Sequence, residues 1–167
     1  LAAFFVLTIS LVGLAASIYA FGYVSEFSGR VSVGLLGSLL NGFLLSMTLV
    51  VLADNGFFFL ILWEVMSLLS YVLVVTEHEK PGVREAGLFY LIMTHVGTAF
   101  IILTLLIFSQ ETGSFSFEAF RHPDQQLPEG LRSIAFFTAL IGFGAKAGIV
   151  PLHVWLPDSM EGPTPIS

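Results

Sequence analysis

Two ionisable residues lie inside long hydrophobic stretches, and they are the residues of this chain most suited to chemistry. Glu64 lies within GFFFLILWEVMSLLSYVLVVT, and Lys146 lies within IAFFTALIGFGAKAGIVPLHVWLP. An ionised side chain at the centre of a bilayer costs roughly 2.5–3.5 kcal/mol on insertion scales, so such a residue is expected to have a task and a partner. The two residues therefore predict the movement of protons or other ions through a membrane.

Glu64 belongs to a polar stripe on an otherwise apolar segment. On a helix, Ser67 and Tyr71 share its face, because they follow it by three and seven residues. Burial favours the protonated carboxyl group, whereas a nearby ammonium favours the carboxylate. Two hypotheses stay open: Glu64 is a proton relay group, or it is a neutral side chain that bonds a neighbouring helix for packing.

Lys146 is the converse case. Burial disfavours its ammonium form and a nearby carboxylate favours it, so moving a carboxylate by a few ångströms changes the proton affinity of the lysine. Such a pair can load and release a proton. A static salt bridge is the structural alternative, and a Schiff-base lysine of the kind found in retinal proteins is a functional one.

Two histidines are candidates for extending the relay. His95 lies in the middle of a hydrophobic segment, and His153 follows Lys146 by two helical turns. Histidine changes charge near neutral pH and suits proton transfer. Alternatively, His95 bonds another helix in its neutral form and His153 sits at the membrane interface. His78 and His122 are predicted to be solvated, and the spacing of the histidines predicts no metal site. We predict no catalytic or cofactor-binding residues.

The composition predicts an all-α, polytopic membrane protein. Hydrophobic residues make up 56% of the chain and charged residues only 11%, against about 25% charged in soluble domains. The chain has 6 Lys and Arg residues and 12 Asp and Glu residues. Only Glu64 and Lys146 among them lie within segments that can cross a hydrocarbon core. These five predicted spans cover residues 1–25, 31–53, 55–76, 86–110 and 133–157.

The fifth span is predicted to be broken. Gly142, Gly144 and Gly148 surround Lys146, and Pro151 follows within two turns. Proline removes a backbone donor and clashes with the preceding turn. In lipid, such a break is tolerated only where protein or a water-filled cavity satisfies the freed backbone groups. Broken helices at this depth are typical of ion sites in transporters.

Charge and cysteine content exclude several other functions. The net charge of −6 arises mostly in the connections, and the chain has no basic patch that would predict nucleic-acid binding. The absence of cysteine excludes disulfides, thiolate metal sites and cysteine-ligated iron–sulfur clusters within this chain. Any redox cofactor is therefore expected on partner subunits.

The two ends of the sequence predict a single membrane-domain fragment over residues 1–167. The first hydrophobic run lacks a basic leader and a small-residue cleavage signal, so we interpret it as a membrane helix rather than a signal peptide. The final MEGPTPIS predicts the start of a further helix at about residue 163, because proline is favoured in a first helical turn.

Three sequence strings carry a family resemblance. LADNGFFFLILWEVMSLLSYVLV resembles helices four and five of the antiporter-like subunits of respiratory complex I and the group 4 membrane-bound hydrogenases. FGAKAGIVPLHVWLPDSMEGPTPIS resembles the broken seventh helix and the approach to the eighth, and its ending is most similar to the complex I type. REAGLFYLIMTHVGTAF is most similar to the hydrogenase-4 and formate hydrogenlyase branch. The resemblance covers essentially the whole chain, as helices three to seven.

The resemblance implies a partial copy of a fold with two inverted repeats that conducts protons. It implies an essential glutamate on the fifth helix paired with a lysine on the broken seventh, and Glu64 and Lys146 stand at those positions. It also implies other membrane subunits and a peripheral redox module as partners, with iron–sulfur, nickel–iron or flavin centres on those partners only. We expect the prokaryotic cytoplasmic membrane as the location.

The function predicted on this basis is that of a proton-translocating, antiporter-like subunit of a membrane-bound oxidoreductase complex. The complex would be of the hydrogenase or NADH:quinone oxidoreductase type, with no redox chemistry in this chain. The first alternative is a subunit of a multisubunit sodium/proton antiporter or a bicarbonate-uptake system, with the proton or sodium as the transported ion. The second is a structural membrane anchor that does not conduct.

Overall fold

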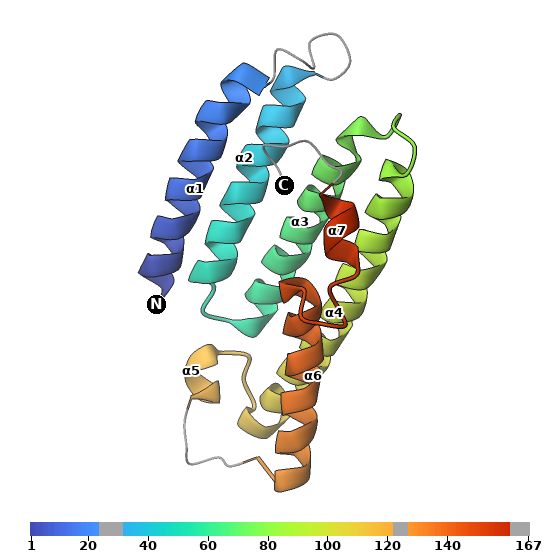
Figure 1. Cartoon of the computed structure of the whole chain (residues 1–167). Coiled ribbons are helices and arrows are strands. Elements are labelled where there is room, and N and C mark those ends of the chain that lie inside the picture. The colour runs from blue at the N-terminus through green and yellow to red at the C-terminus, as the bar shows by residue number, and fades with distance from the viewer. Residues whose placement is uncertain (24–31, 122–126, 161–167) are drawn as a thin grey trace.

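The computed structural model describes residues 1–23, 32–121 and 127–160 of the chain (Figure 1). In order, its helices are α1 (Ala2–Tyr23), α2 (Val33–Leu52), α3 (Gly56–Val74), the 3-10 turn η2 (Val75–Glu77), α4 (Val83–Thr112), α5 (Phe117–Phe120), α6 (Glu129–Ala147) and α7 (Trp155–Ser159). Besides these helices, the described residues contain one isolated β-bridge, between Asn55 and Ser116. The all-α prediction is confirmed.

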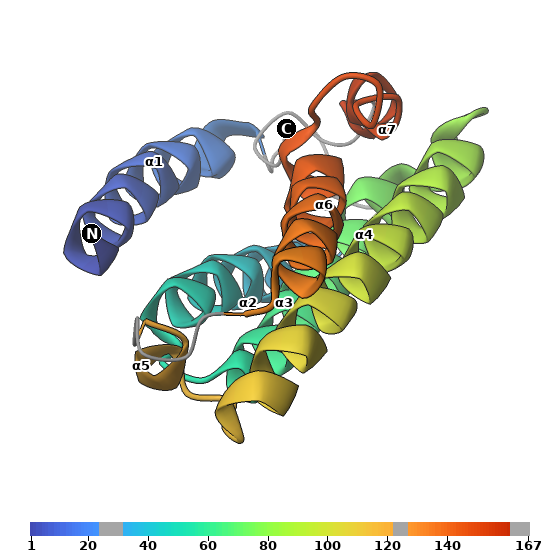
Figure 2. The ribbon, with the colours of Figure 1, turned by 90° about the horizontal axis from the view of Figure 1, so that it is seen from below.

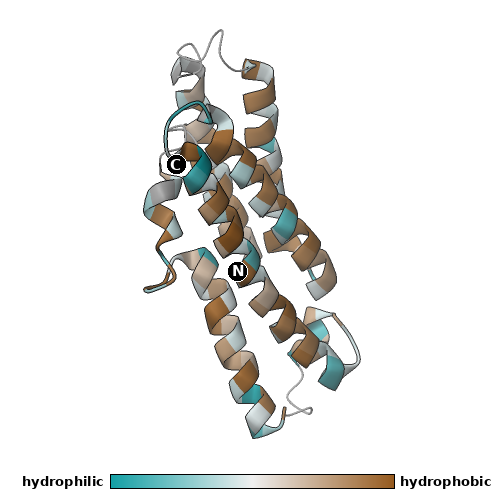
Figure 3. Cartoon of the chain, turned by 90° about the vertical axis from the view of Figure 1, so that its right-hand side faces the viewer, coloured by the Kyte–Doolittle hydropathy of each residue, from teal (hydrophilic) through white to brown (hydrophobic). Residues whose placement is uncertain are grey.

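Four of these helices, α1 to α4, are long and apolar enough to cross a membrane. Figure 3 shows hydrophobic residues along most of their length and hydrophilic residues mainly near helix ends and in connections. Helix α4 has 30 residues, which at 1.5 Å per residue gives about 45 Å, against a hydrocarbon core of about 30 Å. It must therefore tilt or extend beyond the core.

The turn between α2 and α3 is fixed by local and long-range hydrogen bonds. The Asn55 side chain caps α3 by accepting from the backbone N–H of Phe57 at 2.8 Å. The segment before α5 docks beneath this turn, because the N–H of Gly56 donates to the carbonyl of Phe115 at 2.8 Å. The long polar connection thus contains a docked helical turn that the sequence did not predict.

The break predicted in the last hydrophobic segment lies between α6 and α7. Helix α6 ends at Ala147, and Gly148 follows in the left-handed conformation with φ 71°, which only glycine adopts readily. Regular helix resumes at Trp155. The segment predicted as the fifth span is therefore two helices, and the predicted helix near residue 163 lies outside the described residues.

Small residues bring α6 into close contact with α4. A Cβ atom added at Gly142 would lie 2.7 Å from Ile101 Cγ1 and 2.9 Å from the carbonyl oxygen of Gly97, so there is no room for a side chain. Thr104 and Thr138 also form a hydrogen bond between the two helices at 2.8 Å. Figure 2 shows α6 lying along α4. This packing places the end of α6 part-way along α3 and α4 (Figure 1).

Candidate functional site

Lys146 occupies the last turn of α6, immediately before the break. Its ammonium lies near the C-terminal end of a helix, where the helix dipole favours positive charge. The Nζ atom donates to Ser67 Oγ on α3 at 3.2 Å and to Tyr90 Oη on α4 at 2.9 Å. It also lies 5.9 Å from the ring centroid of Trp63 and 5.2 Å from that of Tyr90. Two hydroxyl oxygens and the nearby Trp63 ring therefore stabilise the half-buried ammonium.

Glu64 lies one turn before Ser67 on the same face of α3, as the sequence predicts. Its Oε2 atom is 3.4 Å from His95 Nε2, and its Oε1 atom is buried without a hydrogen-bond partner in the part of the chain that the structure describes. Within those residues Glu64 and Lys146 form no ion pair. The structure therefore brings both residues to one face of α3 but pairs Glu64 with His95.

His95 lies on α4 with half of its side chain exposed. Its Nδ1 is 2.8 Å from the carbonyl oxygen of Leu91, one turn earlier. A carbonyl can only accept, so Nδ1 carries a proton and Nε2 faces the Glu64 carboxyl group. The 3.4 Å separation of Nε2 and Oε2 makes this an ion pair when the imidazole is protonated.

His153 lies elsewhere, in the irregular segment between α6 and α7. Its Nδ1 is buried without a hydrogen-bond partner among the described residues, and the structure shows no bond from it to Lys146. His78 is exposed, and His122 lies outside the described residues. In the described ranges no group of three His, Cys, Asp or Glu residues could hold a metal ion.

The sequence analysis missed three residues of the site: Tyr90, Ser70 and Trp155. Tyr90 is only 4% exposed and contacts Ser70 Oγ through its hydroxyl group. A signal was available in the register of α4, because Tyr90, Thr94 and Gly97 recur at helical spacing on the buried face. Trp155 packs edge-on against Tyr90, with ring centroids 5.1 Å apart.

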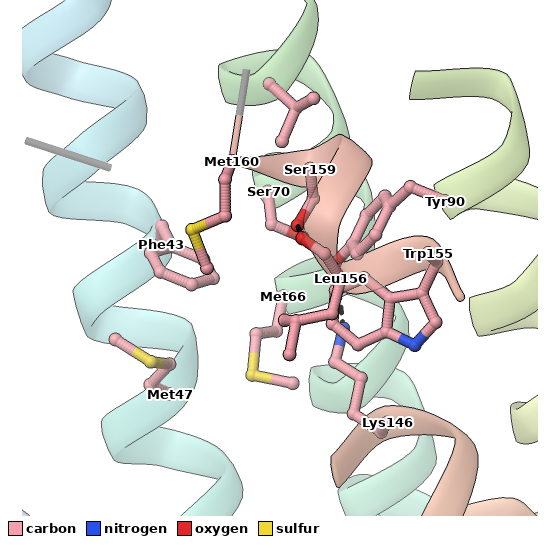
Figure 4. A pocket seen from close by; sticks show the side chains of 11 residues that line it. Phe43, Met47, Met66, Ser70, Tyr90, Lys146, Trp155, Leu156, Ser159 and Met160 are labelled. Atoms are coloured by element: carbon pink, nitrogen blue, oxygen red, sulfur yellow. Dashed lines mark hydrogen bonds between the residues drawn. The ribbon is translucent and has the colours of Figure 1, made fainter. Parts of the chain in front are cut away.

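A cavity of about 260 Å³ adjoins Lys146 (Figure 4). Figure 4 shows methionine and phenylalanine side chains on one side and the polar groups of Lys146, Tyr90 and Ser70 on the other. The lining residues come from α2, α3, α4, α6 and the α7 region. The cavity is therefore a half-open, largely apolar pocket, with the Lys146 ammonium and the hydroxyl groups of Ser70, Tyr90 and Ser159 in its wall.

Comparison with known proteins finds a matching family model and similar sequences. The family model described as "NADH:quinone oxidoreductase/Mrp antiporter, TM" matches residues 53–167. Hydrogenase-4 component B of Escherichia coli K12 is 40% identical over 157 residues, covering 94% of this chain and 23% of that protein. NADH-quinone oxidoreductase subunit L of Mycobacterium tuberculosis is 34% identical over 163 residues, covering 98% of this chain and 25% of that protein.

Solved structures show the same fold. A chain of the archaeal membrane-bound sulfane sulfur reductase superposes with a TM-score of 0.84 at 20% identity, over 99% of this chain and 33% of that chain. A chain of respiratory complex I from Thermus thermophilus superposes with a TM-score of 0.68 at 20% identity, over 99% of this chain and 47% of that chain.

The matched sequence relatives come from bacteria and chloroplasts, and the bacterial ones fit a location in the cytoplasmic membrane. The chain spans about a quarter of the length of these curated relatives. The matched family model covers well over half of the chain and includes Glu64, His95 and Lys146. The chain is therefore an integral membrane protein that belongs to the antiporter-like subunits of the complex I and hydrogenase family.

Proposed function

We propose that this chain forms part of a proton-translocating subunit of a redox-driven complex, of the hydrogenase or NADH:quinone oxidoreductase type. In this proposal Lys146 is the central proton-carrying group, and Glu64 with His95 forms a second proton-holding pair. The observation that carries the proposal is the placement of Lys146. Its ammonium lies at a helix break inside the membrane span, held by hydroxyl groups rather than by a fixed countercharge.

The geometry supports an electrostatic mechanism. Glu64 and Ser67 are three residues apart, or about 4.5 Å along the α3 axis. A small movement of the Lys146 side chain from Ser67 towards Glu64 would therefore create an ion pair. Two unit charges 4 Å apart interact by about 4 kcal/mol at an effective dielectric constant of 20, which changes a proton-binding constant by nearly a thousandfold. Alternating between the two partners would load and release the Lys146 proton.

Electrons would reach the complex through other chains. We place iron–sulfur, nickel–iron or flavin centres on partner subunits, in a peripheral redox module that joins further membrane subunits. The names of the sequence relatives support this assignment, because they are a hydrogenase component and NADH-quinone oxidoreductase subunits. A conformational or charge signal from that module would move Glu64 relative to Lys146.

A second candidate function is a subunit of a multisubunit sodium/proton antiporter, because the matching family model also names the Mrp antiporter. In that case the same pair would exchange protons against sodium without a redox module. Proton transport that requires sodium and continues without electron donors would favour this second function.

The substitution Glu64→Gln tests the proposed function. It keeps the shape of the side chain but removes the charge that would attract Lys146, so we expect proton translocation per electron to fall at least about tenfold. The measurement is proton uptake into vesicles that hold the assembled complex. Glu85→Gln, at an exposed residue in the first turn of α4, is the matched control and should pump normally. Normal pumping by an assembled Glu64→Gln complex would reject the role of Glu64.

A further inference from the structure

A directional chain of hydrogen bonds leads away from Lys146. Ser70 Oγ donates its only hydrogen to the carbonyl oxygen of Ser67 at 2.9 Å, so it accepts in its contact with Tyr90. The Tyr90 hydroxyl therefore donates to Ser70, and its oxygen accepts from the Lys146 ammonium at 2.9 Å. All donors in the chain point in the same direction, which is the arrangement that proton transfer along hydroxyl groups requires.

This chain of hydroxyl groups reaches the cavity shown in Figure 4. Tyr90 and Ser70 are almost fully buried, yet both contribute to the cavity wall beside Lys146. The volume of about 260 Å³ has room for several water molecules, each of which takes about 30 Å³ in the liquid. Buried water requires polar partners, and the two hydroxyl groups supply them on this side of the cavity.

Trp155 fixes the position of the Tyr90 ring. Its indole Nε1 donates to the carbonyl oxygen of Ala145 at 2.7 Å, and its ring packs edge-on against Tyr90. The break frees the Ala145 carbonyl, because the N–H of Ile149 donates to Gly144 instead. Trp155 thereby ties the segment after the break both to the end of α6 and to the residue that bonds Lys146.

We propose that Tyr90 and Ser70 conduct protons between Lys146 and the part of the pocket that Ser70 lines, a route separate from the direct contact of Lys146 with the pocket, and that Trp155 is the positioning residue for Tyr90. The inference rests on the proposed function. In the release direction, an N–H bond of the Lys146 ammonium breaks as its proton moves to the Tyr90 oxygen. The Tyr90 hydroxyl proton moves to Ser70, and the Ser70 hydroxyl proton, turned away from the Ser67 carbonyl, moves to cavity water. The products are a neutral amine and a protonated water, and rotation of both hydroxyl groups restores the chain.

The substitution Tyr90→Phe removes one oxygen atom and keeps the ring against Trp155. In the assembled complex we expect protons translocated per electron to fall at least about tenfold, with electron transfer and assembly retained. Tyr19→Phe, at a tyrosine on α1 that is 53% exposed, is the matched control and should pump normally. Ser70→Ala should lower the same ratio, and Ser70→Thr, which keeps a hydroxyl group, should restore it.

The role of Trp155 is tested by non-additivity. Trp155→Phe keeps an aromatic ring but loses the bond to Ala145, so it should lower the ratio in the wild-type background. It should add no further loss in the Tyr90→Phe background, because it acts through the Tyr90 hydroxyl group. A full additional loss in that background would overturn the positioning role.

The outcomes separate this inference from the proposed function. If Lys146→Ala stops pumping while Tyr90→Phe and Ser70→Ala pump normally, the hydroxyl route is wrong and the proposed function stands. If Lys146→Ala itself pumps normally, the proposed function fails. If Tyr90→Phe prevents assembly, the comparison of Ser70→Ala with Ser70→Thr decides, and equal pumping by the two variants would overturn the route.

Discussion

At the scale of single residues, the site separates its two half-buried ionisable groups and gives each a partner other than the opposite charge. Glu64 faces His95, whose side chain is 50% exposed, and Lys146 faces hydroxyl groups. One carboxylate oxygen of Glu64 stays without a partner among the described residues, and such a group carries a desolvation cost of about 1–3 kcal/mol or more. A nearby cation would relieve this cost, so the arrangement favours approach of the Lys146 ammonium.

The substitution His95→Phe tests the role of the pairing between Glu64 and His95. It keeps a ring on α4 but removes the nitrogen atom that faces Glu64, so the pair can no longer share a proton. We expect proton translocation per electron to fall about tenfold with the complex assembled. His78→Phe, at an exposed histidine beyond α3, serves as the control. Equal pumping by the His95→Phe complex and the wild type would show that His95 has only a packing role.

At the scale of elements, the contact between α4 and α6 determines where Lys146 lies. The contact depends on glycine, because a Cβ atom at Gly142 would overlap both the backbone of α4 and the Ile101 side chain. The packed surfaces leave no space to absorb a methyl group without moving α6.

We therefore expect Gly142→Ala to lower the free energy of unfolding by about 1–3 kcal/mol, the usual cost of overpacking. Thermal unfolding of the purified subunit in detergent measures this change. Gly130→Ala, in the first turn of α6, meets no atom within 4 Å and should leave stability unchanged or raise it slightly. A Gly142→Ala protein as stable as the Gly130→Ala protein would contradict the close contact between the helices.

The sequence predicts the helical segments well but not the contacts between their faces. Hydrophobic length locates the spans, and the glycines near Lys146 together with Pro151 locate the break, because both depend on local chemistry. The partners of Lys146 depend on how α6 lies against α3 and α4, which no local pattern encodes. The family resemblance predicted Glu64 opposite Lys146, whereas the structure places Ser67 and Tyr90 there.

At the scale of the whole molecule, the chain combines an extensive apolar surface with one polar cluster inside the span. Large apolar side chains are exposed along α1 to α4 and α6, as expected for contact with lipid or with other membrane helices, and Figure 3 shows hydrophobic residues along most of these helices. The cluster around Lys146 is reached from α3, α4, α6 and α7, so it depends on the assembled bundle rather than on one helix. The chain spans about a quarter of the length of its curated relatives.

In the proposed function, Lys146 carries the translocated proton. The most direct test measures protons translocated per electron in vesicles that contain the complex with Lys146→Ala. Lys146→Arg is measured beside it, and Lys80→Ala serves as the control in the connection before α4. We predict normal assembly and electron donation but almost no translocation with Lys146→Ala, and incomplete recovery with Lys146→Arg, because arginine hardly deprotonates. Wild-type translocation by an assembled Lys146→Ala complex would contradict the claim.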